Sequence, residues 1–297
     1  MPIYLQPHRL VTTLFCLLFF SLGPQVVPYG RLGCLIFVIW IGLGHFMLTL
    51  LYQWRAGKAN PLFMLGFAGY FLLLSAVPYF WGFERANQLL FMFAAIHSII
   101  HFTFDDLHLS GGHATPVRWL EVWVQGVMFV AFIFYKVFGV DWVLYAGALA
   151  AGMVMLRLVL AWRGYRLDSW SLYCGILAGI FFAALPFYQV IGTLEAYSIL
   201  ATLHFLNWGV AYYKRIANDP VRVKRYVTDT VVIHALLAVL LVMYFAPAAL
   251  PGGILSFRKD TVLLLLFHPV FFYIWVLCHV MFTSRTADFL SLRWRAA

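Results

Sequence analysis

Residues 32–53, LGCLIFVIWIGLGHFMLTLLYQ, form an apolar stretch without a lysine, arginine, aspartate or glutamate. A helix needs about 20 apolar residues to cross the hydrocarbon core of a bilayer, so this stretch is predicted to be a transmembrane helix. The whole chain is 64% hydrophobic and only 10% charged. Soluble globular domains have about a quarter charged residues. We therefore predict an integral membrane protein of the all-α class.

The same length criterion finds about ten apolar stretches along the chain. Short connections separate them, and these connections carry the glycines and prolines that are typical of turns. We expect Pro24 to end the first stretch. The sequence therefore predicts one polytopic helical bundle that covers residues 1–297 as a single membrane domain. The predicted spans are 9–27, 32–53, 62–82, 87–107, 117–138, 142–161, 170–191, 195–214, 227–247 and 261–283.

The basic residues predict the orientation, because lysine and arginine accumulate on cytoplasmic loops. With the N-terminus inside, the outer loops keep only Arg31, Arg85, Lys136, Arg258 and Lys259. The cytosolic segments then hold Arg9, Arg55, Lys58, Arg118, Arg163, Arg166, Lys214, Arg215, Arg222, Lys224, Arg225, Arg285, Arg293 and Arg295. We expect both termini in the cytosol. The net charge of +9 fits attraction to anionic lipid headgroups and gives no reason to expect nucleic-acid binding.

Seven histidines lie inside the predicted spans, and the helical rise places six of them at roughly 6 to 15 Å below the cytosolic boundary. The six are His45, His97, His101, His204, His234 and His279. A single histidine in a span commonly hydrogen-bonds a neighbouring helix. Ionisable side chains are costly at this depth, and several that converge usually mark a functional site. The shared depth predicts one site in the cytosolic half of the membrane.

Imidazole suits iron, copper and zinc, and residues four apart on a helix, such as His97 and His101, can reach one ion. We predict a metal site with an open position for a substrate or oxygen species. Its predicted ligands are His45, His97, His101 and His204, and the weaker candidates are His234 and His279.

Asp105 lies one turn after His101. A metal-bound histidine usually donates its second ring N–H to a carboxylate or carbonyl, so we expect Asp105 to orient a ligand. The alternative is that Asp105 and its neighbour Asp106 end the helix in solvent.

Three segments carry a resemblance to a known family. They are Gly42-Leu-Gly-His45, His101-Phe-Thr-Phe-Asp105 and His204-Phe-Leu-Asn-Trp208. In order and separation they resemble the bacterial and archaeal Brp/Blh β-carotene 15,15'-dioxygenases, which are polytopic non-haem iron enzymes, over about residues 35 to 215. The resemblance implies an Fe(II) ion, dioxygen as co-substrate, a carotenoid-like substrate and a bacterial inner membrane.

The chain departs from that family at two places. The family has a second histidine four residues after the late one, where this chain has Trp208, and Phe46 and Leu48 replace the glycine and aspartate expected after the first histidine. A displaced fourth ligand would come from His97, His234 or His279.

The predicted function is a membrane-embedded non-haem metal oxygenase or oxidase that acts on an apolar lipid or isoprenoid substrate. Fe(II) is the expected metal, and zinc and copper accept the same ligands. One alternative is a haem-binding electron carrier with paired axial histidines, although His268 alone lies in the outer half. Another is a proton-coupled transporter, although the spans hold few carboxylates and no paired inverted repeats.

Overall fold

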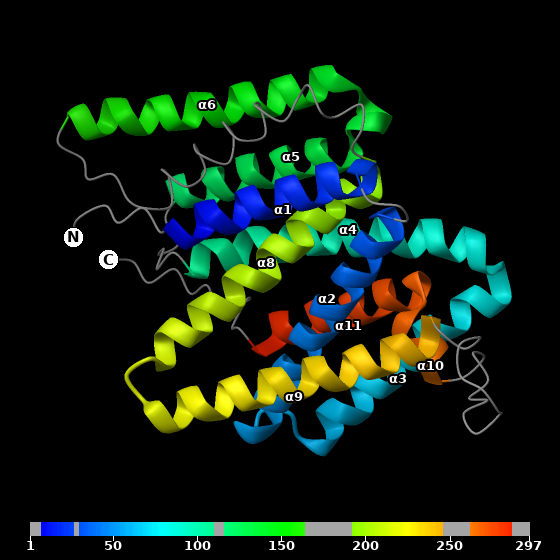
Figure 1. Cartoon of the computed structure of the whole chain (residues 1–297). Coiled ribbons are helices and arrows are strands. Elements are labelled where there is room, and N and C mark those ends of the chain that lie inside the picture. Colours follow the sequence, from blue (N-terminus) through cyan, green and yellow to red (C-terminus); the bar gives the residue numbers. More distant parts are fainter. Residues whose placement is uncertain (1–6, 27–29, 110–115, 164–191, 246–261, 287–297) are drawn as a thin grey trace. The chain divides into compact units, whose positions relative to one another are not determined.

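The computed structural model describes residues 7–26, 30–109, 116–163, 192–245 and 262–286, and within them it contains helices and no strand (Figure 1). The all-α prediction is confirmed for this part of the chain. The helices are α1 (Pro7–Val26), α2 (Gly30–Arg55), α3 (Pro61–Trp81), α4 (Phe83–Leu109), α5 (Pro116–Phe138), α6 (Val140–Trp162), α8 (Thr193–Ile216), α9 (Pro220–Phe245), α10 (Val262–Phe267) and α11 (Pro269–Thr286).

Each predicted span that falls in the described residues overlaps one helix, except 261–283, which overlaps both α10 and α11, and span 170–191 lies outside these residues. Five helices, α2, α3, α4, α6 and α9, are long and apolar enough to cross a bilayer. Helices α1, α5 and α11 contain shorter apolar segments. These helices indicate a membrane-embedded protein.

The structure differs from the sequence prediction at two prolines. The predicted span 261–283 is broken at His268, where α10 ends and α11 begins with Pro269. Proline has no N–H to continue a helix but fits its first turn, and the N–H of Val270 donates to His268 Nδ1 at 3.3 Å. Pro24 was expected to end the first span, but α1 continues through it to Val26, because a proline near a helix end removes only one late hydrogen bond.

The chain divides into two compact units. The first unit contains residues 1–34, 99–208 and 294–297, and the second contains residues 35–98 and 209–293. The chain passes from one unit to the other within α2, α4 and α8. In the first unit α5 packs along α6, and in the second unit α11 packs against α3 and α10 packs against α9 and α11. Each unit holds its own pair of neighbouring histidines. The prediction of a single membrane domain stays a prediction.

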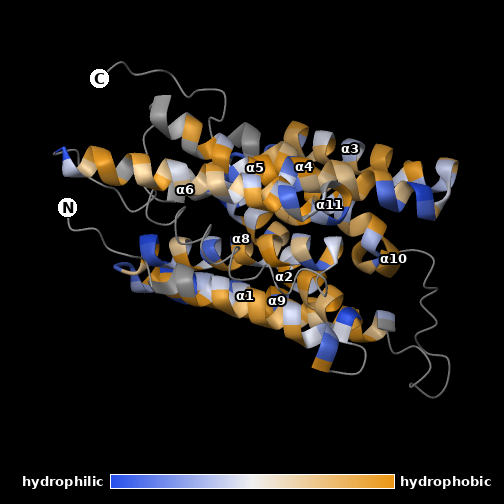
Figure 2. Cartoon of the chain, turned by 90° about the horizontal axis from the view of Figure 1, so that it is seen from above, coloured by the Kyte–Doolittle hydropathy of each residue, from blue (hydrophilic) through white to orange (hydrophobic). Residues whose placement is uncertain are grey.

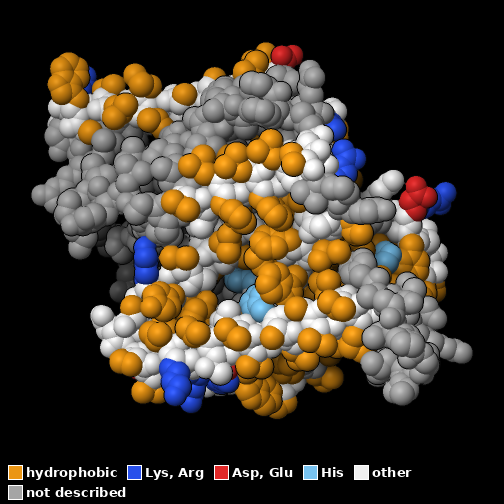
Figure 3. Space-filling model, viewed as in Figure 1, with side chains coloured by type: hydrophobic (Ala, Val, Ile, Leu, Met, Phe, Trp, Pro, Cys, Tyr) orange, Lys and Arg blue, Asp and Glu red, His pale blue; other side chains and the backbone are white. Residues whose placement is uncertain are grey.

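Exposed apolar side chains are abundant on α3 and α9. Figure 2 colours the helices by hydropathy, and the hydrophobic colour predominates. On α3, Leu62 is 77% exposed and Phe80 is 83% exposed. Figure 3 shows hydrophobic side chains over most of the described surface on the visible face, with Lys and Arg confined to small patches. Such a surface is costly in water and favourable against lipid acyl chains.

Candidate metal centre

Three potential metal ligands meet in the first unit. His101 and Asp105 lie one turn apart on α4, so their side chains share a face, and His204 comes from α8. Asp105 Oδ2 is 3.3 Å from His101 Nε2 and 3.8 Å from His204 Nε2. One ligand atom from each of the three residues lies within 4.8 Å of the other two. The arrangement fits a single small cation at the centre of three donors.

The group is buried. His101 and His204 are each 4% exposed and Asp105 is 8% exposed. The ring of Phe102 stacks on the imidazole of His204, with centroids 4.3 Å apart. The ring of Phe205 is also buried, and its centroid lies 5.7 Å from that of His204. A carboxylate in an apolar environment is stable only when it is paired, hydrogen-bonded or bound to a metal. The burial therefore favours a charged partner for Asp105.

Asp105 has a further neighbour in Trp208. The indole Nε1–H of Trp208 donates to Asp105 Oδ2 at 2.6 Å. The sequence prediction gave Asp105 the role of orienting a histidine, and it considered Trp208 only as a missing ligand. The four-residue spacing could have indicated that Trp208 lies near His204, because residues one turn apart share a face of the helix.

The second unit brings together His45 on α2 and His279 on α11. Their ring centroids are 4.9 Å apart. His279 is buried and stacks on Phe46, with centroids 4.6 Å apart and an interplanar angle of 29°.

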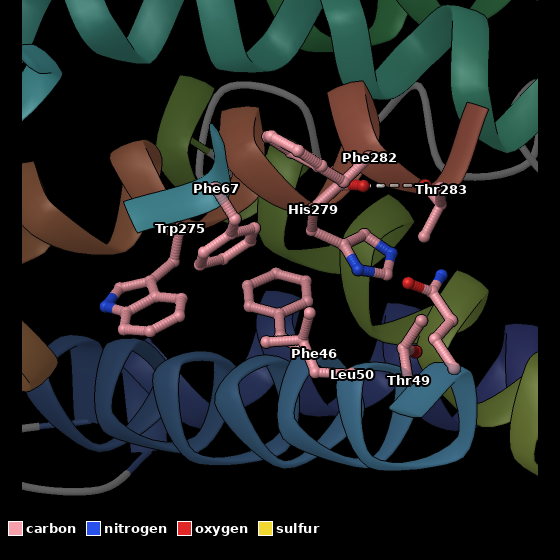
Figure 4. Close-up of a pocket in the computed structure, with 9 residues that line it drawn as sticks. Phe46, Thr49, Leu50, Phe67, Trp275, His279, Phe282 and Thr283 are labelled. Carbon is pink, nitrogen blue, oxygen red and sulfur yellow. Dashed lines mark hydrogen bonds between the residues drawn. The ribbon is translucent and has the colours of Figure 1, made fainter. Parts of the chain in front are cut away.

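His279 also lines a small pocket with a cavity volume of about 10 Å³. Figure 4 shows Thr49, His279 and Thr283 toward one end and Phe67 and Trp275 toward the other. The Thr283 hydroxyl donates to the backbone carbonyl of His279 at 2.7 Å. The remaining lining residues are Phe46, Leu50, Gln53 and Phe282.

His234 is part of a helix contact in the second unit. Its Nδ1–H donates to the carbonyl of Thr230 at 2.8 Å, and the indole of Trp40 donates to the backbone carbonyl of His234 at 2.9 Å. The imidazole lies so close to Gly44 that a Cβ added there would overlap it. Glycine at position 44 therefore permits the close approach of α9 to α2.

His97 lies on the part of α4 that belongs to the second unit, and its side chain is exposed. Its Nδ1–H donates to the carbonyl of Phe93, one turn earlier, at 2.8 Å. The predicted four-histidine site takes His45 and His97 from the second unit and His101 and His204 from the first. That ligand set stays a prediction.

Comparisons with known protein families, with curated proteins and with solved structures found no match to this chain. The resemblance to the Brp/Blh dioxygenases therefore stays a prediction that rests on the three quoted segments.

Proposed function

We propose that His101, His204 and Asp105 bind one Fe(II) ion and that the protein is a membrane-embedded non-haem oxygenase or oxidase. The observation that supports the proposal is the convergence of two buried imidazoles and one buried carboxylate within 4.8 Å. Two histidines and one carboxylate with open positions are the ligand set of many non-haem Fe(II) oxygenases. Zinc and copper bind to similar donors, so metal analysis is the direct test.

The residues fit a divalent cation chemically. Both Nε2 atoms lie near Asp105 Oδ2, where a neutral imidazole and a carboxylate each offer a lone pair. A cation between them offsets the cost of a buried carboxylate.

The bound metal would supply the activation of dioxygen, which protein side chains do not perform. The protein's own residues have three tasks. His101, His204 and Asp105 hold the ion, and the carboxylate offsets part of its charge. Phe102 and Phe205 keep water from the ligands, which protects a reactive centre from side reactions.

The proposed substrate is an apolar lipid or isoprenoid, in the simplest case a carotenoid-like polyene that enters from the bilayer. The wide exposed apolar surfaces of α3 and α9 support this class. Oxidation would take place at a carbon–carbon double bond or a C–H bond of that substrate, with dioxygen as the oxidant.

We also propose about ten membrane crossings, with both termini in the cytosol of a bacterial cell and the site in the cytosolic half of the inner membrane. The distribution of basic residues supports this topology. In the second unit, Arg55 and Tyr52 near the end of α2 both bond to Asp229 near the start of α9, and Tyr52 Oη donates at 2.9 Å. The proposed topology places both of these helix ends on the cytosolic side.

The test is elemental analysis of the detergent-purified protein together with its absorption spectrum. We expect close to one iron per chain and no Soret band, and retinoid-like or other cleavage products when the iron-loaded protein is incubated with a carotenoid and dioxygen. A Soret band would favour the haem-binding electron carrier. Absence of stoichiometric metal would overturn the proposal and favour the proton-coupled transporter.

A further inference from the structure

We propose that Trp208 is a positioning residue that holds the Asp105 carboxylate in the orientation needed to bind the metal. The inference rests on the proposed metal-binding function of the His101–Asp105–His204 group. The proposed role of Trp208 depends on its indole N–H, which donates the hydrogen bond, and not on the size of its ring.

The distances support this role. The Trp208 indole nitrogen is 2.6 Å from Asp105 Oδ2, nearer than His101 Nε2 at 3.3 Å or His204 Nε2 at 3.8 Å. Hydrogen bonds to carboxylates are shorter and stronger than those between neutral groups. The indole N–H is therefore closer to this oxygen than either imidazole and restrains it by a charge-assisted hydrogen bond.

The chemistry of the two groups makes them compatible with a shared ion. A carboxylate oxygen has more than one acceptor site, so Oδ2 can accept the indole N–H and still offer a lone pair to a metal. Indole is only a donor, so Trp208 cannot become a ligand itself. Its hydrogen bond withdraws electron density from Oδ2 and limits the carboxylate's rotation, which favours binding through one oxygen and leaves positions on the ion open.

The arrangement repeats one spacing on two helices. On α4, His101 is followed four residues later by Asp105, and on α8, His204 is followed four residues later by Trp208. Each helix thus contributes one imidazole and one group of the Asp105–Trp208 hydrogen bond. Residues that orient a metal ligand typically change metal affinity by about 10- to 100-fold when they are replaced.

The first experiment uses Co²⁺ as the probe, because its visible absorption bands report coordination geometry. Trp208→Phe keeps a large aromatic ring and removes the N–H. We expect the cobalt affinity to fall by about 10- to 100-fold and the bands to shift in energy. Trp123→Phe is the matched control, since Trp123 lies on α5 of the same unit and is 68% exposed. It should bind cobalt with wild-type affinity and bands.

The second experiment needs no stable Trp208 variant. In protein labelled with ¹⁵N-tryptophan, Asp105→Asn should move one indole resonance far more than Asp141→Asn does, since Asp141 is an exposed residue on α6. If no indole resonance responds selectively to Asp105→Asn, the hydrogen bond and the inference are wrong.

The outcomes separate the two proposals. Wild-type protein that binds no cobalt overturns the proposed metal site and, with it, the role of Trp208. Wild-type protein that binds cobalt, with Trp208→Phe indistinguishable from it in affinity and spectrum, overturns only the inference about Trp208.

Discussion

Two pairs of histidines are built almost alike and have different surroundings. The ring centroids of His101 and His204 are 5.0 Å apart in the first unit, and those of His45 and His279 are 4.9 Å apart in the second. The first pair shares a carboxylate, Asp105, whereas His279 of the second pair stacks on a phenyl ring and lines an aromatic-walled pocket. Proximity of imidazoles alone does not define a metal site. The anionic partner makes the first pair the better candidate.

The largest expected effect comes from His101→Ala, which removes one ligand from the first pair. We expect iron content after purification to fall to background and the affinity for Co²⁺ to fall by more than about 100-fold, beyond the range typical of residues that only orient ligands. Elemental analysis and a cobalt titration measure both. If the purified variant retained a full equivalent of metal, the ion would have to be held elsewhere, and the comparison between the two pairs would be broken.

Asp105→Asn tests the carboxylate itself, because asparagine keeps the shape and an acceptor oxygen but loses the charge. We expect metal affinity to fall by about 100-fold, the upper end of the range for residues that only orient ligands, because a ligand loses its charge. The melting temperature of the metal-free protein should stay the same or rise, since a buried anion without a cation is costly. Thermal unfolding in detergent with and without metal separates the two effects. Asp141→Asn is the control. A lower melting temperature with unchanged metal affinity would make Asp105 a structural residue.

The helices were predictable from sequence because a bilayer requires long apolar stretches, and each stretch in the described residues became a helix. The break at His268 was missed because the stretch around it is apolar throughout, and only Pro269 marks the start of a new helix. Hydropathy has no information on such breaks. Pro24 shows the converse, because a proline near a helix end does not stop the helix.

The candidate site was predictable in part. The depth argument placed His101 and His204 on two helices at similar depth, and the structure brings these two together. It could not predict which oxygen of Asp105 they approach or that Trp208 donates to it, because these features depend on the rotation of each helix about its axis. Depth along a helix follows from residue number, whereas rotation follows from packing with helices distant in sequence.

Gly44→Ala tests whether His234 belongs to packing in the second unit. Alanine normally stabilises a helix relative to glycine, but here its Cβ would overlap an imidazole held by Thr230 and Trp40. We expect a loss of about 1 to 3 kcal/mol in stability, as for other overpacked sites. Thermal unfolding measures it, with Gly33→Ala on the same helix as control, since nothing lies near its added Cβ. Gly44→Ala combined with His234→Ala should recover most of the loss. No recovery would show that the overlap with His234 is not the cause.

The smallest expected effect is that of His279→Phe. The phenyl ring can stack on Phe46 as the imidazole does, so stability should change by less than about 1 kcal/mol for a swap of similar volume. Because the proposed ion is held by His101, Asp105 and His204, we also expect metal content to stay within the error of the wild-type measurement. Elemental analysis of His279→Phe and His101→Ala, purified in the same way, tests this prediction of metal content. Loss of metal in both would mean that the ion needs imidazoles from both pairs, and the ligand set predicted from shared depth would then explain the site better than the carboxylate does.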